Sequence, residues 1–163
     1  RAVIVSRRGG ASRDLTGAAG RQGELCIGAG AEGQVIANAV APGKRPRSSM
    51  APTIVMRDGA PVIAIGSPGG SRIIGYVAQA LIAMLDWEMD VQQAIAMPHL
   101  VNRFGTFDVE AGTGAKALAA PLRDLGFEVN ETDLDSGLHG IVITADGLEG
   151  GADPRREGVA VGD

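Results

Sequence analysis

The chain has 163 residues, which suits one domain or one subunit of a larger protein, and its 45% hydrophobic and 21% charged residues are ordinary for a globular chain. A net charge of −4 and only 3% aromatic residues argue against a nucleic-acid partner, which needs a basic face or stacking rings. No apolar run reaches the ~18 residues that span a bilayer, and no signal peptide is readable at the N-terminus.

The first part of the chain carries few structural signals. Val3–Val5 predicts a short strand, and the Gly- and Arg-rich residues after it have no hydrophobic period. Gly28, Gly30 and Gly33 have the spacing of a dinucleotide-binding loop. No convincing strand precedes them and no acidic residue follows on a second strand, so a flexible connection is the favoured interpretation.

The signals sharpen at residues 53–71. Two apolar runs, 53–56 and 61–65, flank Asp58-Gly59 and predict a β-hairpin. The next residues, Gly66-Ser67-Pro68-Gly69-Gly70-Ser71, lead into an apolar stripe of helical period over 72–87, with Ser71 as the expected N-cap. This segment is not a Walker A loop, because no Lys-Ser or Lys-Thr pair follows at the required spacing.

The glycine turn before this helix is a candidate anion site. The first amide N–H groups of a helix have no intrahelical acceptor and carry the positive end of the helix dipole. Glycines let a ligand oxygen approach such donors closely, so Gly69 and Gly70 suit an anion or the oxyanion of a transition state. A tight strand-to-helix turn without a ligand is the alternative.

The remaining elements alternate between helices and strands. We expect a helix over 91–97 capped by Asp90 and stopped by Pro98, a weak strand over 107–110, a helix from Thr113 to Leu125 shortened or kinked by Pro121, and strands over 127–130, 139–144 and 148–152. Strands that come as hairpins on either side of a block of helices indicate an α+β fold with antiparallel pairing.

A second candidate site is the pair Ser48-Ser49. Adjacent hydroxyls beside the cations Lys44, Arg45 and Arg47 could hold a carboxylate or a phosphate. Paired serines in a polar loop are also commonly solvated or act as caps, and the residues alone leave both interpretations open.

The other reactive side chains give weaker signals. His99 and His139 belong to no GxSxG-type pattern and are expected to pack or support structure. The single cysteine, Cys26, has no neighbouring histidine, so no internal disulfide and no nucleophilic role is expected. No Cys/His cluster or calcium loop is present, and we predict neither a metal nor a cofactor. The acidic residues Glu128, Glu131, Asp133 and Asp135 are expected on a solvated edge.

Two long segments in register resemble the small subunit of γ-glutamyltranspeptidases (glutathione hydrolases). They are 37–53, Ala-Asn-Ala-Val-Ala-Pro-Gly-Lys-Arg-Pro-Arg-Ser-Ser-Met-Ala-Pro-Thr, and 66–74, Gly-Ser-Pro-Gly-Gly-Ser-Arg-Ile-Ile. The resemblance continues in order through 90–95, Pro98-His99, 110–112 and 152–156. It covers residues 37–163 as one small-subunit-like domain and leaves 1–36 as an unmatched leader.

The resemblance implies a fold and a reaction. The family fold is the N-terminal-nucleophile hydrolase αββα sandwich with mostly antiparallel sheets, of which this chain would form part. Its members arise from a precursor that cuts itself into a large and a small subunit. The new N-terminal Thr attacks the γ-glutamyl carbonyl with its own α-amine as base, and the acyl group passes to water, an amino acid or a peptide. Substrates are γ-glutamyl compounds such as glutathione, and the location is periplasmic or secreted.

Carried over residue by residue, Ser48 and Ser49 resemble the pair that holds the donor α-carboxylate. Gly69 and Gly70 resemble the pair whose amides form the oxyanion hole. The family's Thr-Thr-His and Asp-Asp-Phe runs are not found in the 163 residues. The isolated chain is therefore predicted to be inactive and, without the other strands of the sandwich, poorly stable. The alternatives are a related acylase acting on a cephalosporin side chain and a non-catalytic fragment that pairs with a large subunit.

Overall fold

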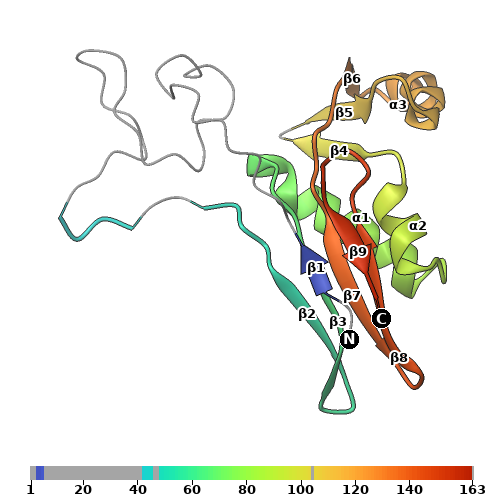
Figure 1. The fold of residues 1–163 in the computed structure, drawn as a ribbon. Coiled ribbons are helices and arrows are strands. Elements are labelled where there is room, and N and C mark those ends of the chain that lie inside the picture. Colours follow the sequence, from blue (N-terminus) through green and yellow to red (C-terminus); the bar gives the residue numbers. More distant parts are fainter. Residues whose placement is uncertain (1–2, 6–41, 46–47, 104, 163) are drawn as a thin grey trace.

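A computed structural model describes residues 3–5, 42–45, 48–103 and 105–162 (Figure 1). Its strands are β1 (Val3–Val5), β2 (Thr53–Arg57), β3 (Ala60–Gly66), β4 (Leu100–Arg103), β5 (Thr106–Glu110), β6 (Glu128–Thr132), β7 (His139–Thr144), β8 (Gly147–Ala152) and β9 (Val159–Val161). Its helices are α1 (Ile73–Leu85), α2 (Val91–Ala96) and α3 (Ala119–Asp124), with 3₁₀ turns η1 (Gly70–Arg72) and η2 (Gly114–Leu118). No helix within these described ranges is long and apolar enough to cross a membrane.

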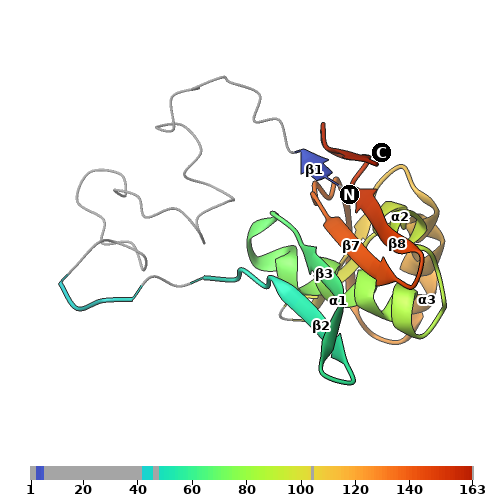
Figure 2. The same cartoon turned by 60° about the horizontal axis from the view of Figure 1, so that its bottom comes forward.

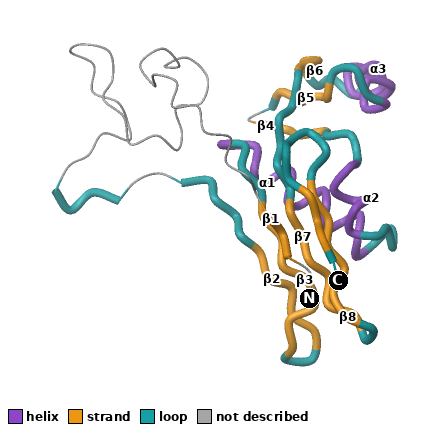
Figure 3. Tube along the Cα trace, in the orientation of Figure 1, coloured by secondary structure: helices purple, strands orange, loops and turns teal. Residues whose placement is uncertain are grey.

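The strands form three sheets. A four-stranded antiparallel sheet has the order β2-β3-β7-β8, and β1 pairs antiparallel with β9. A three-stranded sheet has the order β4-β5-β6, with β5 and β6 parallel. It lies with α3 at one end of the larger sheet (Figure 1; Figure 3 marks the element types). This mixed and mostly antiparallel architecture agrees with the predicted α+β class.

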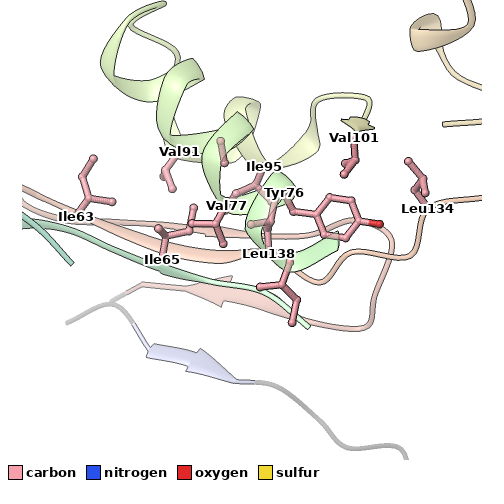
Figure 4. Close-up of a cluster of buried hydrophobic side chains, with 11 residues drawn as sticks. Ile63, Ile65, Tyr76, Val77, Val91, Ile95, Val101, Leu134 and Leu138 are labelled. Atoms are coloured by element: carbon pink, nitrogen blue, oxygen red, sulfur yellow. The ribbon is translucent and has the colours of Figure 1, made fainter. Parts of the chain in front are cut away.

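Helices α1 and α2 cover one face of the four-stranded sheet (Figure 2). The main core lies between them and contains Ile63 and Ile65 of β3, Tyr76 and Val77 of α1, Ile95 of α2 and Leu138 before β7 (Figure 4). On the opposite face of the sheet Ile54, Ile143 and Leu148 are exposed at 65%, 42% and 45%. One sheet with one helix layer is the partial sandwich that the sequence predicts.

Most of the predicted elements are confirmed. The hairpin β2–β3 turns at Asp58-Gly59, both with positive φ, and β1 forms where Val3–Val5 predicts it. Asp90 caps α2, since its Oδ1 accepts a hydrogen bond from the Gln93 amide at 2.8 Å. Strands β4 and β9, and the parallel pairing of β5 with β6, were not expected from the sequence.

Two expectations about helices need correction. Ser71 is not an N-cap, because the two preceding glycines wind the chain into the 3₁₀ turn η1, and α1 begins only at Ile73 with no side-chain cap. The single helix predicted from Thr113 to Leu125 is divided into η2 and α3. Pro121 lies in the first turn of α3, where its missing N–H is not needed.

Candidate functional site

The glycine turn presents two backbone amides at the start of η1 and α1. Gly69 has φ 135° and Gly70 has φ 59°, conformations that strongly favour glycine. The Arg72 amide donates to the Gly69 carbonyl at 3.2 Å, whereas the described residues offer no acceptor to the amides of Gly69 and Gly70. Both glycines are half-buried. Two free N–H groups at the positive end of a helix can stabilise an oxyanion.

The two glycines differ in what surrounds them. A Cβ on Gly69 would lie 2.7 Å from Cε2 of Tyr76, so an aromatic ring closes that side of the turn. A Cβ on Gly70 would meet nothing within 4 Å. The turn is therefore supported from behind at Gly69, whereas the Cβ side of Gly70 is open.

Two side chains anchor the turn to neighbouring elements. The Nε of Arg72 donates to Oδ2 of Asp108 on β5 at 2.9 Å. The Ser67 hydroxyl donates to the Pro68 carbonyl at 2.6 Å and accepts from the amide of Gly137 at 3.2 Å. These contacts hold the turn between the two larger sheets and so fix the direction of its amides.

The serine pair lies at the same end of the β2–β3 hairpin as the glycine turn. Thr53, the first residue of β2, is opposite Ile65 near the end of β3. Ser48 and Ser49 precede Thr53 by a few residues, and the glycines follow Ile65 by a similar number. The segment before β2 extends away from the sheet (Figures 1 and 3), with Ser48 exposed and Ser49 half-buried.

The local contacts of the serine pair are limited. The Ser48 hydroxyl accepts from the Met50 amide at 3.2 Å, a turn-forming bond that still leaves its own hydrogen to donate. Arg47, Cys26 and the glycines at 28, 30 and 33 lie outside the described residues. The topology thus brings the serine pair and the glycine turn to one end of the four-stranded sheet. Of the two, the serine segment lies further from that sheet.

Behind the glycine turn lies a buried polar network that no pattern in the sequence indicates. Arg155 donates to both carboxylate oxygens of Glu110, from Nε at 2.6 Å and from Nη2 at 2.7 Å, and to Oδ1 of Asp153 at 3.1 Å. Ser136 donates to Oδ2 of Asp153 at 2.5 Å. The His99 amide donates to Glu110 at 2.7 Å, so five residues distant in sequence share one network.

The protonation state of His99 follows from its neighbours. The Ser136 hydrogen goes to Asp153, so the Ser136 oxygen, 2.6 Å from Nε2 of His99, accepts from Nε2–H. His99 is 1% exposed, and burial together with the positive charge of Arg155 lowers its pKa to about 4. His99 is therefore neutral at pH 7 and packs within the core, as the sequence analysis expected.

The two carboxylates of the network remain charged although they are buried. Burial alone would raise the pKa of Glu110, but hydrogen bonds from Arg155 and from the His99 amide hold it below its usual range. For Asp153 burial acts in the same direction and is outweighed by hydrogen bonds from Ser136, Arg155 and Leu138. These are the features of a structural ion-pair network.

The remaining candidates behave as surface residues. Glu131 lies near Lys116 and Arg123 at 3.4 and 3.8 Å, and Asp135 lies 3.4 Å from Arg156. Throughout the part of the chain that the structure describes, no three His, Cys, Asp or Glu side chains are grouped so as to hold a metal ion. His139 opens β7 with Nδ1 2.9 Å from the Gly137 carbonyl, a structural contact.

Solved structures define the class of fold. The chain matches γ-glutamyltranspeptidase from Pseudomonas nitroreducens with a TM-score of 0.68 at 31% identity, over 80% of this chain and 70% of that one. It also matches the transpeptidase CapD of Bacillus anthracis with a TM-score of 0.63 at 27% identity, over 75% of each chain. Both likenesses place it in the N-terminal-nucleophile hydrolase fold.

Sequence relatives narrow the class to one family. A family profile described as Gamma-glutamyltranspeptidase matches residues 27–163, beginning before the stretch at 37 on which the resemblance was drawn. Glutathione hydrolase proenzymes are 35% identical over 123 residues (Bacillus subtilis, 73% of this chain) and 38% over 115 residues (Escherichia coli, 69%). The chain belongs to the γ-glutamyltranspeptidase family. It spans about a fifth of those relatives, 21% and 20% of their length, and they are named as enzymes.

Proposed function

We propose that this chain takes part in γ-glutamyl acyl transfer and hydrolysis, with small γ-glutamyl compounds such as glutathione as donors. The observation that supports this most directly is the pair of amides of Gly69 and Gly70. They have no acceptor among the described residues, and a Cβ on Gly70 would meet nothing within 4 Å. Donors preorganised in this way can each lower the barrier of acyl transfer by about 3 kcal/mol.

In this proposal the two loops bind different parts of the donor. The hydroxyls of Ser48 and Ser49 hold the α-carboxylate, and the amides of Gly69 and Gly70 face the γ-carbonyl oxygen. When a nucleophile attacks that carbonyl, the oxygen becomes an anion and its hydrogen bonds to the two amides strengthen. The amine then leaves, and water, an amino acid or a peptide accepts the acyl group.

We propose that the nucleophile is not part of the segment that contains the serine pair and the glycine turn. The family resemblance assigns the attack to an N-terminal Thr in a Thr-Thr-His run, which the 163 residues do not contain. We therefore propose that the 163-residue polypeptide is inactive by itself and pairs with a large subunit of the same precursor. A periplasmic or secreted location belongs to the same proposal.

The binding step can be tested with the chain alone by NMR on isotope-labelled protein. L-Glutamine, a γ-amide of glutamate, should shift the amide resonances of Gly69, Gly70 and the serine pair in a saturable way at millimolar concentration. 4-Aminobutanamide, which keeps the amine and the amide and lacks only the α-carboxylate, should shift them far less. Ser48→Ala with Ser49→Ala should abolish saturation, whereas Thr144→Ala, which removes a hydroxyl at the β7–β8 turn, should bind normally. Glycine resonances that do not respond to L-glutamine would overturn the proposal.

Inactivity is tested separately with a chromogenic γ-glutamyl amide. The purified chain should release no chromophore above the buffer rate. Turnover that disappears in the double serine variant would show that the chain supplies its own nucleophile, and this part of the proposal would be wrong.

A second candidate function is hydrolysis of a different acyl group. Two acylase proenzymes from Pseudomonas strains SE83 and V22 are 32% and 30% identical to this chain over 120 and 119 residues. If the bound acyl group is that of a cephalosporin side chain, such an amide should displace L-glutamine in the same titration. L-Glutamine binding that this competitor leaves unchanged would reject the acylase alternative.

A further inference from the structure

The ring of Tyr76 lies directly behind the glycine turn. Tyr76 belongs to α1, and side chains of a helix tilt toward its N-terminus, so the ring reaches back over the turn that begins the helix. A Cβ on Gly69 would be 2.7 Å from Cε2 and 3.1 Å from Cδ2 of this ring. The backbone of Gly69 therefore rests on the edge of a flat and rigid side chain.

The ring itself has little freedom to move. Tyr76 is fully buried, and its centroid lies 4.3 Å from that of His99 with an interplanar angle of 36°. His99 is held at Nε2 by Ser136 and at its backbone amide by Glu110. In Figure 4 the Tyr76 ring extends between Val101 and Leu138 with its hydroxyl on the side of Leu134. Polar contacts on His99 thus fix the ring that supports Gly69.

The hydroxyl of Tyr76 takes no part in this support. It is buried and, among the described residues, has no hydrogen-bond partner. A buried hydroxyl without a partner destabilises a fold, so the hydroxyl is not what holds the ring in place. The shape and position of the ring remain as the features that act on the turn.

We propose that Tyr76 is a positioning residue that orients the Gly69 and Gly70 amides, with His99 as its support. The inference rests on the proposed function, in which these amides bind the γ-carbonyl oxygen. It assigns to the ring the task of keeping both N–H groups pointed at one oxygen position while the open side at Gly70 admits the donor. Loss of the ring should weaken this site more than it weakens the rest of the fold.

The test compares four variants by amide hydrogen exchange and by the L-glutamine titration. Tyr76→Met fills much of the space without a flat ring, Tyr76→Phe keeps the ring without its hydroxyl, and Ile95→Ala removes a fully buried side chain of α2. In Tyr76→Met, exchange of the Arg72 amide, which donates to the Gly69 carbonyl at 3.2 Å, should become about tenfold faster relative to the Lys116 amide, which donates to the Thr113 carbonyl at 3.3 Å, with matching loss of L-glutamine affinity. In Tyr76→Phe, both the exchange rate at the turn and the L-glutamine affinity should stay at the wild-type values. His99→Leu should reproduce the effect of Tyr76→Met in part.

The outcomes separate this inference from the proposed function. If the glycine resonances of the wild type do not respond to L-glutamine, the proposed function fails. The exchange data still report on whether Tyr76 positions the glycine turn. If the wild type binds and Tyr76→Met leaves exchange and affinity at the turn unchanged, the positioning role is wrong. It is also wrong if Ile95→Ala accelerates exchange at the turn as strongly, because the ring would then matter only through overall stability. Exchange measured by mass spectrometry on the peptide over 66–72 gives the same reading if a variant yields poor spectra.

Discussion

The guanidinium of Arg72 forms an ion pair with the carboxylate of Asp108, and its Nε and Nη2 lie 2.9 and 2.8 Å from the same oxygen, Oδ2. Arg72 ends η1, and Asp108 lies in the middle of β5. The other oxygen of Asp108 accepts from Asn130 on β6 at 3.2 Å. One carboxylate therefore connects the turn that carries the candidate oxyanion site to two strands of the three-stranded sheet.

Removing this connection should loosen the turn. Asp108→Asn takes away the charge that faces Arg72 and should lower the free energy of unfolding by about 1–3 kcal/mol, since hydrogen bonds to charged groups are among the stronger ones. The partly exposed Arg72 can turn toward solvent, which limits the loss. Urea unfolding measures the effect. Asp135→Asn, at the exposed Arg156 contact of 3.4 Å, is the control and should change stability very little. Equal losses in both variants would contradict the anchoring role.

Breaking the Glu110–Arg155 pair should lower the free energy of unfolding by considerably more. Its side chains are 9% and 15% exposed, and Glu110→Gln leaves a guanidinium buried with only Asp153 to balance it. Loss of one partner from a buried pair typically costs about 3–5 kcal/mol. Glu131→Gln is the matched control, because Lys116 lies 3.4 Å away with a side chain that is 68% exposed. We expect it to cost less than about 1 kcal/mol in the same denaturation experiment. A small effect of Glu110→Gln would show that Arg155 finds other partners.

The glycine turn and the buried network behind it differ in how well the sequence predicts them. The glycine turn is a local feature: an apolar strand, two adjacent glycines and a helical stripe follow one another within 61–85. Each of these signals has a cause in backbone conformation, so the turn could be located by inspection. The error over Ser71 has the same local origin, because two positive φ angles produce a 3₁₀ turn in place of a capped first helical turn.

The buried network could not be predicted in this way. Ser136 and Asp153 are 17 positions apart, His99 and Ser136 are 37 apart, and Glu110 and Arg155 are 45 apart. No periodic pattern links them, because their contacts depend on how β5, the loop before β7 and the segment after β8 pack. The parallel pairing of β5 with β6 escaped prediction for a related reason, since it depends on the path of η2 and α3 between those strands.

The pH dependence of stability should reflect His99. Its folded pKa of about 4 lies below the usual 6.5, so between these values the unfolded chain binds a proton that the folded chain does not. Stability should therefore fall as the pH decreases from 6.5 to about 4, by about 3 kcal/mol in total. The depressed pKa values of Glu110 and Asp153 add a further loss at lower pH, as these groups become protonated. Thermal unfolding measured across this pH range should show the loss of stability between pH 6.5 and about 4 in the wild type and in Val77→Ala. The same loss should be absent in His99→Gln. A slope that persists in His99→Gln would assign it to other groups.

Helix α1 and strand β4 pack closely against each other at Gly75. A Cβ there would lie 2.7 and 3.3 Å from the two methyl carbons of Val101, which is 3% exposed and stiff because it is branched at Cβ. Alanine normally favours a helix over glycine by about 1 kcal/mol, but here overpacking should reverse the sign and destabilise by about 1–3 kcal/mol.

The Gly75→Ala variant therefore distinguishes close packing from helix propensity. Its midpoint in urea should fall, and adding Val101→Ala should recover part of the loss, because the smaller side chain makes room for the new methyl group. Gly114→Ala in η2, where a Cβ would meet nothing within 4 Å, is the control and should be neutral or stabilising. If Gly75→Ala raised the midpoint as propensity alone predicts, the contact between α1 and β4 would be looser than described. The link from β4 through Val101 to the helix that carries the glycine turn would then lose its support.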